Sequence, residues 1–188
     1  MNFKIKKRSL LVNEYFKVEK AIVEFDQHFD EEPVETIRFN LIRGFAVTTL
    51  LYHKEKNALI LVKQFRYSTA EAGYPWMIEL PAGLTETDEN PLIAAKRETL
   101  EETGYLTNNL IEINRFFVAP GCTDEQIILY YAEVDENSRI SSGGGVNGEN
   151  EDIKLIFLPV DLIDDFMENE VIDAKTIIGL NWFKNNKL

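Results

Sequence analysis

The sequence has few of the residues that build disulfide frameworks, zinc sites or membrane spans. Its 188 residues include one cysteine, Cys122, and two histidines, His28 and His53, which stand in no recognisable pattern and receive no catalytic role. A single cysteine cannot form a disulfide within the chain, so we expect a reducing compartment and place the protein in the cytoplasm. No apolar run approaches the ~18 residues of a membrane helix, and the basic residues 1–7 are not followed by the apolar core of a signal peptide.

Positive charge is also scarce. The chain has 20 lysines and arginines against 32 aspartates and glutamates, a formal net charge of -12. A surface of this sign repels a phosphate backbone, so nucleic acid is not an expected partner, and the apolar runs are too short for a membrane. The hydrophobic content of 45% in a chain of this length suits one compact domain with a small appended sheet.

One helix carries an unusual concentration of carboxylates. Asn90 is a good N-cap, Pro91 suits the first helical position and Gly104 suits a left-handed C-terminal residue, which together predict a helix over residues 91–103. At about 100° per residue, the glutamates fall on one face and apolar residues on the other. The acidic face holds Glu98, Glu101 and Glu102 with Ala94 and Tyr105, and the expected core face holds Leu92, Ile93, Thr99 and Leu100.

Carboxylates at this spacing repel one another and are expected to be compensated by cations. Arg97 stands four residues before Glu101 and is expected to orient it, which leaves Glu98 and Glu102 to face a metal. Oxygen ligands without a nearby histidine or cysteine favour Mg²⁺, or Mn²⁺, over zinc. The alternative is an ordinary solvated acidic face.

The segment resembles the signature of the Nudix hydrolases at every fixed polar and glycine position. The matching residues are Gly83, Glu89, Arg97, Glu98, Glu101, Glu102 and Gly104. Thr99 departs from the family, which usually has a bulky aliphatic residue there, and is expected to weaken packing. The resemblance implies an α/β fold, the Nudix α/β/α sandwich on a mixed sheet, with a small N-terminal antiparallel β-sheet.

Two flanking segments are similar to ADP-ribose pyrophosphatases and related nucleoside diphosphate-sugar hydrolases. Residues 79–83, Glu-Leu-Pro-Ala-Gly, precede the signature, and the resemblance implies that the carbonyl of Ala82 ligates a metal together with Glu98 and Glu102. Residues 119–125 resemble the substrate-side loop of that subgroup, in which the glutamate matching Glu125 holds a ribose.

Residues 143–153 resemble the mobile catalytic loop of the same subgroup. The resemblance implies that Glu149 is the general base, that Glu151 is a further metal ligand, and that Glu101 and Glu102 complete the catalytic glutamates. Glycines 143, 145 and 148 also match the dinucleotide-binding fingerprint, which needs a strand before it and a helix after it. Here a polar stretch leads in and a strand-like segment leads out, so we reject that interpretation. A plain flexible loop is the alternative.

Three further residues are expected to bind substrate. Arg66 matches an arginine that the family places on the diphosphate or the distal sugar, and a guanidinium suits such oxygens; the alternative is a surface arginine that ends a strand. Arg38 and Tyr15 lie where the subgroup has an arginine and a base-stacking aromatic. The subgroup commonly exchanges its N-terminal sheet in a homodimer, so both would serve the partner's site. A tyrosine in a strand is also commonly a core residue.

Hydrophobic patterning predicts the remaining elements. Residues 1–42 are expected to form a hairpin-like N-terminal sheet that serves dimerisation and is swapped between the two copies. Residues 43–188 are expected to form the Nudix hydrolase domain. A charged turn is expected at 26–33. The predicted strands are 15–25, 34–42, 44–52, 58–65, 77–80, 114–118, 126–133 and 153–158, and the other helices 161–168 and 173–186.

The resemblance implies hydrolysis of the pyrophosphate bond of a nucleoside diphosphate sugar with two or three Mg²⁺ ions. GDP-mannose and ADP-ribose are the candidate substrates, and the triple glycine at 143–145 favours GDP-mannose. A Nudix-fold sensor that binds a nucleotide sugar without cleaving it is the alternative function. The complete set of glutamates favours the enzyme.

Overall fold

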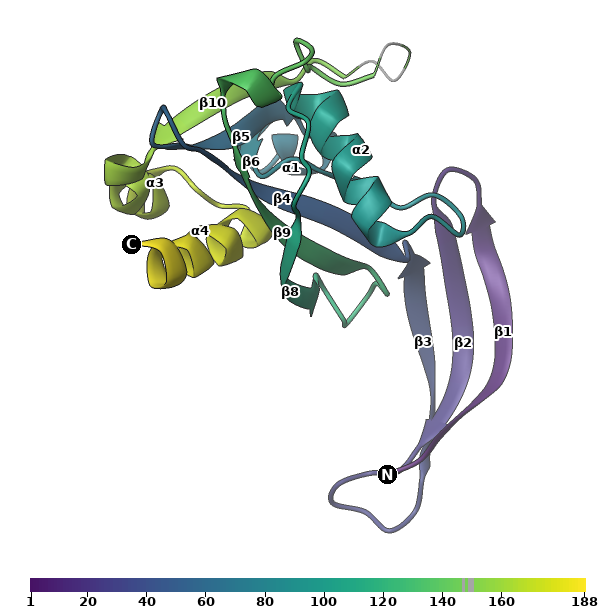
Figure 1. Cartoon of the computed structure of the whole chain (residues 1–188). Helices are drawn as coiled ribbons and strands as arrows, with labels where there is room; N and C mark the ends of the chain where they lie inside the picture. The colour runs from purple at the N-terminus through teal and green to yellow at the C-terminus, as the bar shows by residue number, and fades with distance from the viewer. Residues whose placement is uncertain (147, 149–150) are drawn as a thin grey trace. The chain divides into compact units, whose positions relative to one another are not determined.

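The computed structural model describes residues 1–146, 148 and 151–188, and Glu149 therefore lies outside the described residues. The chain divides into two compact units, Met1–Gly44 with Phe117–Gln126 and Phe45–Phe116 with Ile127–Leu188 (Figure 1). The strands are β1 (Phe3–Asn13), β2 (Lys17–Phe25), β3 (Val34–Ile42), β4 (Phe45–His53), β5 (Ala58–Phe65), β6 (Trp76–Glu79), β7 (Ala82–Leu84), β8 (Ile111–Phe117), β9 (Gln126–Val134) and β10 (Lys154–Pro159). The helices are α1 (Tyr67–Ala70), α2 (Pro91–Thr103), α3 (Ile163–Asn169) and α4 (Ala174–Lys187).

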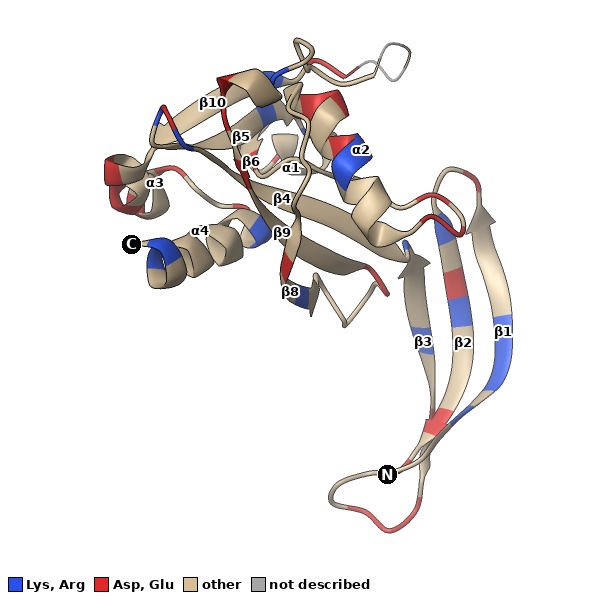
Figure 2. Cartoon of the chain, in the orientation of Figure 1, with Lys and Arg blue, Asp and Glu red and all other residues tan. Residues whose placement is uncertain are grey.

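The first unit contains a three-stranded antiparallel sheet in the order β1-β2-β3. The turn between β2 and β3 covers residues 26–33, as predicted, but the hairpin-like arrangement was wrong because β1 adds a third strand. The pattern hid this strand, since every residue of β1 is exposed and no alternation of buried and exposed positions marks it. Figure 2 shows that part of β1 consists of lysine and arginine residues, drawn in blue.

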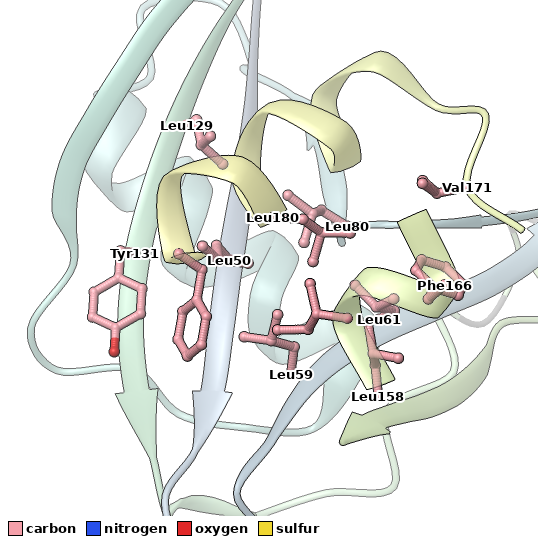
Figure 3. Close-up of a cluster of buried hydrophobic side chains, with 12 residues drawn as sticks. Leu50, Leu59, Leu61, Leu80, Leu129, Tyr131, Leu158, Phe166, Val171 and Leu180 are labelled. Atoms are coloured by element: carbon pink, nitrogen blue, oxygen red, sulfur yellow. The ribbon is translucent and has the colours of Figure 1, made fainter. Parts of the chain in front are cut away.

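The second unit is built on a seven-stranded sheet in the order β10-β5-β4-β9-β8, with β6 paired to β5 and β7 paired to β4. Helix α2 covers one face, where Ala94 and Ala95 pack with Ile128 of β9. Helices α3 and α4 cover the other face, where Leu180 and Leu129 join the largest core cluster (Figure 3). Successive residues of β9 thus point to opposite faces, as a pleated strand requires. The predicted α/β/α sandwich on a mixed sheet is confirmed.

Helix α2 has the predicted bounds. The Asn90 side chain accepts a 2.9 Å hydrogen bond from the backbone N–H of Leu92, and Gly104 ends the helix with a φ of 78°. The predicted faces were wrong in part, because Leu92 and Ile93 are exposed. The buried positions are Ala94, Ala95, Thr99, Glu102 and Thr103. The small side chains of this face let α2 pack closely on the sheet. Because Glu102 lies on the same face of the helix, it is buried with them.

Two of the short elements were not predicted. The sequence pattern does not indicate β7 or the four-residue helix α1, and the predicted start of β8 is three residues late. The predicted start of the helix before α4 is too early, because residues 160–162 form a 3₁₀ turn. Within the described part of the chain, no helix is both long and apolar enough to cross a membrane.

Candidate active site

The centre of the site is the carboxyl group of Glu102, which the helix turns toward the loop before it. Glu102 is only 3% exposed, and its Oε2 accepts a 3.1 Å hydrogen bond from the backbone N–H of Ala82. Burial, opposed by the Ala82 N–H and the charge of Arg66 and assisted by the charges of Glu98 and Glu151, raises the pKa of Glu102 to about 8. The positive charge around Glu102 is therefore too small to keep its carboxyl group ionised at neutral pH in the absence of a cation.

One guanidinium holds the other carboxylates of the signature. Arg97 Nη1 donates to Glu98 Oε1 at 2.7 Å and to Glu101 Oε2 at 3.0 Å. Its Nε and Nη2 donate to both oxygens of Glu89, at 3.1 and 3.0 Å, and Nη2 also reaches the carbonyl of Leu84 at 3.3 Å. The expected pair with Glu101 is confirmed, but Arg97 also binds Glu98, which was expected to be free. Figure 2 shows these acidic and basic segments side by side on α2.

Gly83 lets the loop approach the helix. A Cβ atom on this residue would overlap the carboxyl group of Glu98, so no other residue fits without displacing Glu98. The same short strand, β7, carries Ala82, whose N–H binds Glu102. Strand β7 pairs with β4, and α2 packs on both strands. The sheet thereby fixes the loop and the glutamates relative to one another.

The donor set suits a hard divalent cation. In the described residues, no three His, Cys, Asp or Glu side chains form a group that could hold a metal ion. Burial nevertheless raises the pKa of Glu98; Arg97 opposes this shift, and the charges of Glu101 and Glu151 add to it. Buried carboxylates that raise one another's pKa are relieved by a cation bound to oxygen. The oxygen donors of these residues are of the kind that Mg²⁺ and Mn²⁺ prefer, and both the cation and its individual ligands, Ala82, Glu98, Glu102 and Glu151, stay predictions.

The glycine segment closes the end of α2. The backbone N–H groups of Gly144 and Gly145 donate to the carbonyls of Glu102 and Glu101, at 2.8 and 3.1 Å. These bonds satisfy carbonyls that a helix C-terminus leaves without partners. The carboxylate of Glu151 accepts a 3.4 Å hydrogen bond from the N–H of Val146. Strand β10 follows this segment, so the rejection of a dinucleotide fingerprint is confirmed.

Arg66 follows β5 directly and takes part in a partly buried ion-pair network that was not predicted from the sequence. Its Nε donates to Glu79 Oε1 at 2.7 Å, and Lys175 forms an ion pair with the other carboxylate oxygen. Lys175 Nζ also lies 3.1 Å from a carboxylate oxygen of Asp173. A glutamate at the end of a buried strand was the signal in the sequence, because a buried charge needs a partner.

Two of the predicted substrate residues lie in the part of the first unit that contains the three-stranded sheet. Tyr15 lies between β1 and β2, is 85% exposed, and packs edge-on against Phe16 with 4.9 Å between ring centroids. It is not a core residue. Arg38 lies on β3, donates to the hydroxyl of Thr36 at 3.0 Å and sits over the ring of Phe25.

Glu125 also belongs to the first unit. Its carboxylate lies 3.8 Å from Arg43 Nε. The preceding residue, Asp124, accepts hydrogen bonds from the N–H groups of Arg43 and Gly44, at 2.7 and 3.2 Å. Burial opposes ionisation of Asp124, but these N–H groups hold its pKa below the ordinary value. Asp124 fixes the segment that presents Glu125. The roles of Tyr15, Arg38 and Glu125 stay predictions.

Comparison with known proteins agrees with this geometry. Residues 42–178 match the family described as NUDIX domain. The chain is 33% identical to the GDP-mannose pyrophosphatase of Cronobacter sakazakii, over 96% of this chain and 94% of that protein. It is 32% identical to the GDP-mannose pyrophosphatase of Escherichia coli K12, over 97% and 95% of the two chains. A crystal structure of an ADP compounds hydrolase superposes with a TM-score of 0.76 at 19% identity and covers 100% of this chain and 97% of its own.

Proposed function

The chain belongs to the NUDIX family of pyrophosphatase hydrolases, and from this premise we propose that it cleaves the pyrophosphate bond of a nucleoside diphosphate sugar. The products would be a nucleoside monophosphate and a sugar phosphate. The observation that carries the proposal is the buried carboxylate of Glu102, bound to the N–H of Ala82 and surrounded by further negative charge. A group in this state is suited to bind cations rather than to stabilise the fold.

Divalent cations are part of the proposal, since the family typically uses them. Two or three Mg²⁺ ions, or Mn²⁺, would be held by Glu98, Glu102, Glu151 and the carbonyl of Ala82. When bound, they would neutralise the phosphoryl oxygens and so reduce the repulsion that protects a phosphoanhydride from a nucleophile. Arg97 supports this arrangement because it holds Glu98 and Glu101 in place.

The chain supplies the remaining chemistry through its loops. Glu149, in the proposal, takes the proton from the attacking water, and Glu101 and Glu102 complete the catalytic set. Arg66 binds oxygens of the diphosphate or of the distal sugar. Glu125 binds the ribose. These four roles rest on the family resemblance, supported for Arg66 by the nearby charge of Glu102.

We place GDP-mannose first among the substrates. The GDP-mannose pyrophosphatases named above are similar to this chain over nearly its full length, and the triple glycine points the same way. ADP-ribose presents the same diphosphate and is the second candidate. Because the two differ in base and sugar, residues such as Arg38 and Tyr15 would decide between them.

A homodimer is part of the proposal, with Arg38 and Tyr15 serving the site of the second copy. It is supported by the apolar side chains that the first unit leaves exposed, among them Leu10, Leu11 and Phe39. Exposed apolar clusters of this kind mark interaction surfaces. Light scattering during gel filtration should give the mass of a dimer, and Leu10→Glu should shift it to a monomer. Leu188→Glu, at an exposed leucine of the other unit, should not; a monomeric unaltered protein contradicts the proposal.

The test of the activity is phosphate release from a panel of nucleotide sugars with Mg²⁺ and an added phosphatase. GDP-mannose should be cleaved fastest, and Glu102→Gln should lower turnover by about 10³-fold or more. Equal rates on GDP-mannose and ADP-ribose would remove the preference but keep the reaction. Binding of a nucleotide sugar without cleavage, with either Mg²⁺ or Mn²⁺, would instead identify a binding protein.

A further inference from the structure

The second unit contains a chain of four alternating charges, Arg66, Glu79, Lys175 and Asp173, of which the middle two are buried. Glu79 is 4% exposed and Lys175 is 8% exposed. Burial opposes ionisation of Glu79, but Lys175 and Arg66 hold its pKa below the ordinary value. The carboxylate therefore stays charged and keeps one oxygen for each cation.

A partly buried ion-pair network of this kind contributes little to the stability of the fold. Removing two charges from water costs about as much as their attraction returns, and apolar residues of the same volume often stabilise a core equally well. A buried pair does fix the geometry of its members, because each has few other arrangements that keep it satisfied. This favours a role in holding one of the four side chains in position.

Arg66 is the member of the network whose side chain is exposed enough to bind a ligand. Its side chain is 42% exposed, whereas those of Glu79 and Lys175 are 5% and 10% exposed. Glu79 binds Nε of Arg66, and among the described residues no partner binds its Nη1 or Nη2. The positive charge of Arg66 also acts on Glu102, at the centre of the candidate active site. The two Nη groups are thus left for a ligand beside that site.

Glu79, the partner of Arg66, and Lys175, the second partner of Glu79, both stand on elements of regular secondary structure. Glu79 ends β6, which pairs with β5. Lys175 lies in the first turn of α4, where Asp173 caps the helix by accepting a 3.0 Å hydrogen bond from the N–H of Thr176. The Thr176 hydroxyl in turn accepts a 2.9 Å hydrogen bond from the N–H of Leu80, next to Glu79. The start of α4 is therefore bonded to the strand that leads into the active-site loop.

We propose that Glu79 is a positioning residue for the pyrophosphatase reaction: it fixes Arg66 through Nε so that both Nη groups face the diphosphate or distal sugar. Lys175 is the counter-charge that keeps Glu79 ionised and in place. The inference rests on the proposed function and adds a residue that touches no reacting atom. A planar guanidinium held at Nε presents two parallel N–H groups, which suits the paired oxygens of a phosphate or a sugar diol.

The test is a double-mutant cycle on kcat/KM with GDP-mannose and Mg²⁺. Arg66→Ala should lower kcat/KM by about 10²-fold, and Glu79→Gln by about 10- to 100-fold. In the double variant, Glu79→Gln should add less than about threefold, because Glu79 acts only through Arg66. Glu133→Gln is the matched control, since this glutamate pairs with Lys187 on α4 away from the candidate site.

A second variant separates positioning from folding. Glu79→Asp keeps the buried negative charge but withdraws the carboxylate by one methylene from both Arg66 and Lys175. Lys175 retains Asp173 as a partner, so the variant should fold and still lose activity. Thermal midpoints identify any variant that fails to fold. Full additivity in the cycle, or unchanged kcat/KM in both Glu79 variants, overturns the inference. If the unaltered protein cleaves no nucleotide sugar, the proposed function fails instead, and the two failures are distinct.

Discussion

The hydroxyl of Thr99 in α2 donates a 2.9 Å hydrogen bond to the hydroxyl of Thr49 in β4, and each residue is only 1% exposed. Thr99 stands where the family usually has a bulky aliphatic residue, and the sequence analysis expected a packing defect there. The structure provides a polar contact between helix and sheet in its place. Threonine at both positions keeps the buried hydroxyl groups satisfied.

Replacing Thr99 by valine should therefore destabilise the protein although the shape is conserved. The change leaves the hydroxyl of Thr49 buried without this partner, which should lower the free energy of unfolding by roughly 1–2 kcal/mol. Urea unfolding followed by circular dichroism measures it. Thr87→Val, at an exposed threonine of the loop before α2, is the control and should stay within about 0.5 kcal/mol. Equal stability of both variants would show that the Thr99 hydrogen bond is not needed.

The sequence was sufficient for the elements whose signals are local. Helix α2 has the predicted bounds because Asn90 and Gly104 determine its ends through their own side chain and backbone. Strand β1 was missed because no face of it is buried, so the hydrophobic pattern contained no period to detect. Strand β7 is three residues long and forms only through pairing with β4, which is a long-range contact.

The residues of the candidate site could be predicted from the sequence, but the contacts between them could not. The signature glutamates could be named from their spacing, yet the inward rotation of Glu102 depends on how the alanines of α2 pack on the sheet. The bond from Arg97 to Glu98 depends on side-chain conformation. The link from Glu79 to Lys175 joins residues that are far apart in the sequence, and a single sequence does not identify which cation pairs with the buried glutamate.

Arg97 should be required both for stability and for activity. Replacing it by methionine leaves Glu89, Glu98 and Glu101 without their shared cation, so we expect a loss of roughly 2 kcal/mol in the free energy of unfolding and of about 10²-fold in kcat/KM. Arg115→Met is the matched control, because within the described ranges 1–146, 148 and 151–188 the ion pair of Arg115 is with Glu112 alone, on an exposed strand. A similar small effect of both changes would mean that the guanidinium does not organise the signature.

Gly83 should not tolerate alanine. The added Cβ would overlap the carboxyl group of Glu98 and displace it, so kcat/KM should fall by about 10²-fold and the apparent Mg²⁺ requirement should rise. Metal titration of the activity checks both effects. Gly121→Ala is the control for the thermal midpoint, since a Cβ there meets open space and its backbone is not left-handed. Unchanged metal dependence in Gly83→Ala would contradict the close approach.

The free energy of unfolding of the metal-free protein should depend on pH through Glu102. Its pKa in the folded protein is about 8 against an ordinary value of 4.5, so between these values the folded protein holds a proton that the unfolded chain has released. The free energy of unfolding should therefore fall as pH rises from about 5 to about 8, by on the order of 3 kcal/mol for this group. Urea titrations at several pH values, with a chelator present, measure this slope.

Glu102→Gln should flatten that slope, because glutamine cannot release the proton. Mg²⁺ should restore stability at about pH 8 in the unaltered protein, since a cation compensates the ionised carboxylate, and should do so much less in the variant. Glu133→Gln serves as a control with an ordinary slope, because the Glu133 pKa is lowered by the Tyr131 hydroxyl and Lys187 and its charge is already compensated. A slope that is the same in Glu102→Gln and in the unaltered protein would place the proton elsewhere.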